Sequence, residues 1–191
     1  YDGLIPCVGC TACMIMVATQ NKYLALFGGL LMGGLIGYIV GTIVTRVKIP
    51  AFLATLAVSQ VASGGIMIAT GGIKINDLGD FTVFGKGSVG PVWISVILMF
   101  AAMIICHIIL TKTSFGRKVF AVGGNYSAAV ASGIDAGRII RRVYMIDGIA
   151  TALAAVLLMS RLGSGQPSAG QGYAFDAITG AVVGGCSIYG G

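Results

Sequence analysis

The chain has 191 residues, of which 57% are hydrophobic and only 9% are charged, whereas about 25% is usual for a soluble domain. Twelve lysines and arginines against six acidic residues give a net charge of +6. Such a chain cannot cover a globular surface with polar groups, and its basic residues flank apolar runs instead of forming an exposed patch. We therefore predict an all-α integral membrane protein, a polytopic transmembrane helix bundle, with no nucleic acid as partner.

The first apolar segment, residues 4–19, is short for a membrane span. It contains the stretch CVGCTAC, with Cys7, Cys10 and Cys13 three residues apart. This spacing resembles iron–sulfur ligation, but no fourth cysteine follows at the expected distance. We expect small packing residues here, with no metal site and no cofactor.

Residues 24–44 form the clearest predicted span, which carries no charge. Gly29, Gly33, Gly37 and Gly41 recur every four residues and so share one helix face. A face of this kind lets a neighbouring backbone approach closely or lines a pore, and we favour close packing.

Residues 51–70 form a second, more polar span. Thr55, Ser59 and Ser63 recur every four residues on one face, which either bonds to a neighbouring helix or faces a water-filled path. A glycine-rich loop over residues 71–90 follows, and then two further spans over 91–111 and 143–162. The final stretch, residues 173–191, is too rich in glycine to assign as one straight helix.

Two aspartates lie within apolar segments, where a carboxylate is costly. We expect Asp147 to pair with Arg141 or Arg142 near the lipid headgroups. For Asp176, structural pairing and a place in a transport path remain equal alternatives.

Lysine and arginine are enriched in cytoplasmic loops, so their distribution predicts orientation. Placing residues 112–142 inside puts eight basic residues on the cytoplasmic side and four outside. The stretch NYSAAVASG lies within this loop. Asn125 is suited to begin a helix and Gly133 to end it. The short helix between them is marginal alone, and its small side chains suit a socket on a partner protein.

The sequence offers no catalytic constellation and no phosphate-binding GxxxxGK[ST] motif. We therefore expect no enzyme activity in this chain. If transport here uses ATP, another chain binds it.

Three stretches together resemble the permease subunits of bacterial ABC importers for monosaccharides, the ribose-type family. They are PAFLATLAVSQVASGG, TSFGRKVFAVGGNYSAAVASGI and the segment from YMIDGIATALAAV to GGCSIYGG. The resemblance implies a multi-pass permease of the bacterial plasma (inner) membrane, with residues 1–191 as one partial transmembrane domain and 112–142 as its cytoplasmic coupling loop. The implied partners are an ATP-binding subunit, an extracytoplasmic sugar-binding protein, a second permease subunit in a homodimer or heterodimer, and membrane lipid.

Under this resemblance, two sets of residues are candidate sites. The coupling helix that contacts the ATPase would comprise Gly123, Gly124, Asn125, Ala128, Ala129, Ser132 and Gly133. The translocation path for a ribose-like pentose or a hexose would use Thr55, Ser59, Ser63 and Asp176.

The sequence departs from the family pattern at two positions: Asp147 stands where a small or neutral residue is common, and Ala174 where Glu is common. These departures leave the substrate open. The alternative is an ion-coupled secondary transporter or channel for a small polar solute, with Asp147 or Asp176 coupling to the ion. Since the chain begins with Tyr and stops within SIYGG, we expect a piece of a longer permease.

Overall fold

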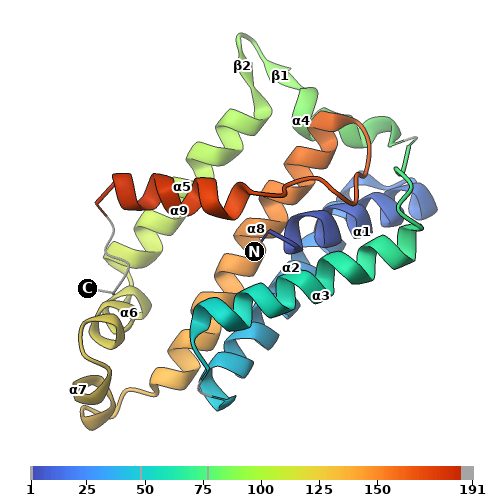
Figure 1. Cartoon of the computed structure of the whole chain (residues 1–191). Coiled ribbons are helices and arrows are strands. Elements are labelled where there is room, and N and C mark those ends of the chain that lie inside the picture. Colours follow the sequence, from blue (N-terminus) through green and yellow to red (C-terminus); the bar gives the residue numbers. More distant parts are fainter. Residues whose placement is uncertain (1, 48, 77, 186–191) are drawn as a thin grey trace.

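The computed structural model describes residues 2–47, 49–76 and 78–185, and within them the chain is built mainly of helices (Figure 1). In chain order the elements are α1 (Leu4–Thr19), α2 (Lys22–Val47), α3 (Ala51–Thr70), the 3₁₀ helix η1 (Gly79–Thr82), α4 (Val83–Lys86), β1 (Ser88–Val89), β2 (Val92–Trp93), α5 (Ile94–Lys112), α6 (Ser114–Gly124), α7 (Tyr126–Ala131), α8 (Ala136–Leu162) and α9 (Tyr173–Val183). The two strands form one short antiparallel hairpin. The predicted all-α class is confirmed.

Among the described residues, four helices are long and apolar enough to cross a membrane: α2, α3, α5 and α8. At 1.5 Å per residue they measure about 28 to 40 Å, and the hydrocarbon core of a bilayer is about 30 Å thick. The four predicted spans are therefore confirmed as helices. Only α8 begins well before its apolar run, at Ala136. It does so because the Asp135 side chain accepts a hydrogen bond from the backbone N–H of Arg138 at 2.9 Å and caps the helix.

The glycine face of α2 packs closely against α8. A Cβ atom added at Gly33 would lie 2.5 Å from the Cβ of Ala152 and 2.5 Å from the backbone oxygen of Gly148. One added at Gly37 would overlap with the backbone oxygen of Tyr144. The prediction of a close helix contact is confirmed, and α8 contributes a glycine of its own to it.

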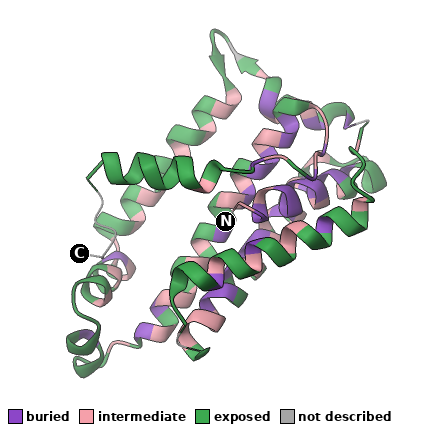
Figure 2. Ribbon diagram, in the orientation of Figure 1, coloured by how far each residue is buried: buried purple, intermediate pink, exposed green. Residues whose placement is uncertain are grey.

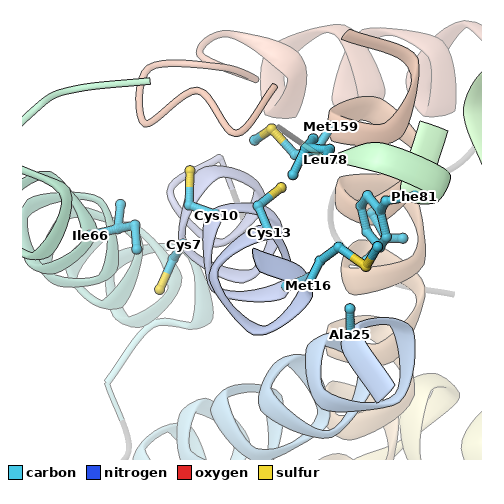
Figure 3. Close-up of a cluster of buried hydrophobic side chains, with 11 residues drawn as sticks. Cys7, Cys10, Cys13, Met16, Ala25, Ile66, Leu78, Phe81 and Met159 are labelled. Carbon is cyan, nitrogen blue, oxygen red and sulfur yellow. The ribbon is translucent and has the colours of Figure 1, made fainter. Parts of the chain in front are cut away.

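Helix α1 lies at the centre of the buried core, as Figure 3 shows. Cys7, Cys10 and Cys13 are buried among Met159, Phe81 and other apolar side chains, and their sulfur atoms point in different directions. Within the described part of the chain, no three His, Cys, Asp or Glu side chains gather to hold a metal ion. The three cysteines are packed in this apolar cluster as small buried side chains.

The segment between α3 and α5 is more ordered than the predicted loop over residues 71–90. It contains η1, α4 and the hairpin, and Leu78 and Phe81 are buried against the core. The buried Ser160 of α8 donates a hydrogen bond to the backbone oxygen of Phe81 at 2.5 Å and accepts one from the backbone N–H of Gly85 at 2.7 Å. These contacts hold the segment against the C-terminal end of α8.

Burial is concentrated where α1, α2 and α8 meet, whereas α5 and α9 are exposed or only partly covered along their length (Figure 2). No residue of α5 or α9 is buried. Side chains such as Phe100, Met103 and Ile104 are about half exposed on α5. An apolar surface of this kind is compatible with lipid chains, which fits the high hydropathy of α5.

Candidate functional site

A cavity of about 530 Å³ lies between the start of α1, the side of α3 and the start of α9. The polar residues that line it are Asp2, Thr55, Ser59, Gln60, Ser63 and Gln171. The structure thus places all three hydroxyl residues of the predicted stripe on one cavity. The sequence predicted that they share a helix face but did not indicate what lies opposite.

The cavity offers hydroxyl and amide groups. Thr55 donates its hydroxyl hydrogen to the backbone oxygen of Phe52 at 2.9 Å, so its oxygen remains free to accept a second bond. Thr55 and Ser63 are partly exposed, whereas Ser59 is 6% exposed and lies deepest of the three. The arrangement can exchange hydrogen bonds with a neutral polar solute without enclosing it.

Asp176, the fourth candidate for the path, does not line this cavity. The positions of α9 that face it are Ala174, Phe175 and Ile178, while Asp176 is exposed on another side of the helix. The reason is helical geometry. Ile178 is four residues from Ala174 and three from Phe175, so these three share one side of α9, whereas Asp176 projects from another side. Asp176 and the hydroxyl stripe are therefore not brought together at this cavity, and a place for Asp176 in the path stays a prediction.

Sequence reasoning missed Asp2. Its carboxylate accepts hydrogen bonds from the backbone N–H of Gly172 at 3.1 Å and of Ala174 at 2.5 Å, at the start of α9. The partners are 170 and 172 positions apart in the sequence, so no local signal pointed to this contact. Gln60 was visible inside the second span, but nothing in the sequence singled it out from its neighbours.

The predicted short helix exists as α7, with the expected caps. The Asn125 side chain accepts a hydrogen bond from the backbone N–H of Ala128 at 2.9 Å. At the other end Gly133 has φ +78°, and the N–H groups of Gly133 and Ile134 bond back to Val130 and Ala129. This pattern ends a helix with a glycine in the left-handed region.

The small residues of α7 do not all face outward. Ala128 and Ser132 are exposed, whereas Ala129 is 5% exposed and packs inside the chain. The small face predicted for a partner is therefore accessible at Ala128 and Ser132 only. Gly123 and Gly124, at the end of α6, have open space around them.

Helix α7 lies at the same end of the molecule as the C-terminus of α2 (Figure 1). A second cavity, of about 410 Å³, is lined by Val44 and Thr45 of α2 together with Tyr126 and Ile140. The structure thus brings Arg46, in the last turn of α2, and the segment around α7 to one side. Lys48, the other basic residue of this prediction, lies outside the described residues. The predicted orientation requires these two segments to share a side, and the cytoplasmic identity of that side stays a prediction.

Asp147 does not form the expected ion pair. The one ion pair within the described ranges joins Asp135 and Arg138 at 3.3 Å, and neither Arg141 nor Arg142 pairs with Asp147. Side chains three and four residues apart are neighbours on a helix, and these arginines are six and five residues away. Asp147 instead lines an apolar cavity of about 250 Å³ between α5, α6 and α8.

Comparison with known proteins extends this picture. The profile of the family described as "Branched-chain amino acid transport system / permease component" matches residues 5–191. The ribose import permease protein of Bacillus subtilis (strain 168) is 41% identical over 79% of this chain and 48% of its own length. The ribose import permease protein of Escherichia coli (strain K12) is 36% identical over 98% of this chain and 60% of its own length. The L-arabinose ABC transporter permease protein of Azospirillum brasilense is 32% identical over 96% of this chain and 54% of its own length.

The chain spans about half the length of the curated relatives it matches. No solved structure matches it. The family profile nevertheless covers nearly the whole chain, and four of its described helices are suited to cross a membrane. The chain therefore belongs to the family of permease components of branched-chain amino acid transport systems, as a multi-pass protein of the bacterial inner membrane.

Proposed function

We propose that this chain forms part of the membrane-spanning permease subunit of an ATP-binding-cassette importer for a monosaccharide. It supplies the translocation path for a ribose-like pentose or a hexose, and a separate subunit hydrolyses ATP. Relatives named as ribose and L-arabinose permeases support this assignment. An extracytoplasmic sugar-binding protein and a second permease subunit complete the importer.

The observation that carries the proposal is the row of hydroxyl side chains along the cavity wall of α3, at Thr55, Ser59 and Ser63. A sugar presents hydroxyl groups on every side, and each one both donates and accepts hydrogen bonds. Several weak and interchangeable bonds let such a solute pass without being held. A high-affinity site is not needed in a path of this kind.

The same lining argues against a branched-chain amino acid, the solute in the family's description. That solute carries a carboxylate and an ammonium group, and each requires a countercharge when it leaves water. Among the described lining residues, Asp2 is the only charged one, and both of its oxygens accept bonds from backbone N–H groups. None of the described lining residues is a cation that could meet a carboxylate.

The test is thiol labelling in the assembled importer. Cysteine is introduced at Thr55 or Ser63, in a background where Cys106 and Cys186 are replaced by serine. Cys186 lies outside the described residues, and Cys7, Cys10 and Cys13 are buried and need no change. We expect a charged, membrane-impermeant thiol reagent to label both positions and substrate to slow the reaction.

The matched control is Val61→Cys on the same helix. Val61 is 76% exposed in the chain but does not line the cavity, so lipid should protect it from a charged reagent. If Thr55→Cys and Ser63→Cys resist labelling in every nucleotide state, the path lies elsewhere. Protection of the labelled sites by leucine and not by pentoses or hexoses would reverse the choice of substrate class.

A further inference from the structure

Helix α9 begins without a cap of its own. Its first residue is preceded by Gly172, which has φ +89° and no side chain that could accept a hydrogen bond. The first N–H groups of any helix lack partners within the helix and must find them elsewhere. In this chain Asp2, from the opposite end of the sequence, accepts bonds from the N–H groups of Gly172 and Ala174.

The segment that carries Asp2 is itself fixed tightly. A Cβ atom added at Gly3 would overlap with the backbone oxygen of Ser59 on α3. The loop before α9 rests on the same region, because a Cβ at Gly170 would lie 2.8 Å from Cγ2 of Ile5. Asp2 is therefore anchored to the wall of the cavity that contains the hydroxyl row.

The rest of α9 is covered little by the described part of this chain. None of its residues is buried, and Phe175 and Val183 are 65% and 84% exposed. Its contribution to the cavity comes from its first two turns, at Ala174, Phe175 and Ile178. Within this chain, the described residues therefore fix the helix at its N-terminal end and cover little of it beyond that end.

We propose that Asp2 is a positioning residue that latches α9 across the cavity, so that breaking its two hydrogen bonds swings α9 away and opens the cavity on that side. A carboxylate is well suited to this role, since a negative charge at a helix N-terminus is stabilised by the helix dipole. The opening moves a cavity wall without disturbing the packing of α1, α2 and α8. This inference rests on the proposed function for its role in transport, but the latch itself is a property of the fold.

The latch is tested by the distance between spin labels at Val61→Cys on α3 and Val183→Cys on α9, in the complete permease in lipid nanodiscs. We expect Asp2→Ala to shift the distribution to longer distances and to raise the displaced fraction roughly fivefold, the factor that loss of a typical helix cap produces. The displaced fraction in Asp2→Asn should lie between those of the unaltered protein and Asp2→Ala, because the amide keeps one of the two acceptor oxygens. Asp80→Ala, which removes an exposed carboxylate from η1, is the matched control and should change nothing.

A second measurement separates positioning from general stability. In Asp2→Ala the rate at which the charged, membrane-impermeant reagent labels Ser63→Cys should rise, whereas Val61→Cys should stay protected by lipid from that reagent. An unchanged distance distribution in Asp2→Ala would overturn the latch, and if that variant does not fold, an unchanged distribution in Asp2→Asn does so equally. Because the distances require no transport, they decide the latch even if labelling shows that the path lies elsewhere.

Discussion

Gly148 occupies the point where α8 crosses α2. A Cβ atom at this position would overlap with the backbone oxygen of Gly33 and would lie 3.1 Å from the Cα of Gly37. Backbone atoms in a helix cannot move aside as the end of a flexible side chain can. The two helices must therefore separate to accommodate any larger residue at Gly148.

We expect Gly148→Leu to destabilise the folded chain by about 3 kcal/mol, the upper part of the range for overpacking. This exceeds the gain of about 1 kcal/mol from replacing a helical glycine by a better helix former. Gly64→Leu on α3 is the control, since nothing lies within 4 Å of a Cβ built there. Thermal unfolding in detergent should show a lower midpoint for Gly148→Leu alone, and equal midpoints would contradict the packing account.

The sequence predicted one half of this contact. The spacing of Gly29, Gly33, Gly37 and Gly41 indicated a close approach, because four-residue spacing places them on one side of any helix. The partner Gly148 has one small residue at the same spacing, Ala152, but Tyr144 and Val156 at the next such positions are larger, so no row of glycines marked it. At the residue scale, regular spacing was readable, whereas contacts made by single residues such as Gly148 and Asp2 required the three-dimensional structure.

At the scale of elements, hydropathy predicted the four long helices because apolar length alone distinguishes a membrane span. It did not predict η1, α4 or the hairpin within residues 71–90. These short elements depend on tertiary contacts, and a four-residue helix has little stability by itself. Ser160 is an example of such a tertiary contact. Its hydroxyl bonds to the backbone of Phe81 in η1 and of Gly85 in α4, more than 70 residues away in the sequence.

Ser160→Ala should loosen this outer segment. The change leaves the N–H of Gly85 and one carbonyl of the buried Phe81 without their partner, which costs about 1–3 kcal/mol. We expect faster proteolysis within residues 71–90 and a lower unfolding midpoint. Ser168→Ala is the control, because Ser168 is exposed. Equal cleavage rates in both variants would show that Ser160 does not hold the segment.

At the scale of the whole molecule, the two candidate sites, the cavity beside α3 and the short helix α7, lie at different parts of one bundle of packed helices. The core formed by α1, α2 and α8 lies beside the cavity of α3, and α8 begins at Ala136, directly after the segment that holds α7. Gly41 of α2 packs against Arg141 near the start of α8, so both helices meet close to this loop. Packed helices therefore connect the region of α7 with the core beside the cavity.

Ala128 provides the test of the coupling helix. Since Ala128 is exposed and Ala129 is buried, Ala128→Trp places a bulky group on the outer face of α7, while Ala129→Trp would disturb the packing beneath it. We expect Ala128→Trp to insert into the membrane with an unchanged unfolding midpoint, to abolish sugar uptake and to weaken co-purification of the ATP-binding subunit. Lys74→Trp, on the exposed segment after α3, is the control and should retain that subunit fully. Normal uptake with normal retention in Ala128→Trp would exclude α7 as the contact, because a tryptophan cannot occupy a socket shaped for alanine without displacing the partner.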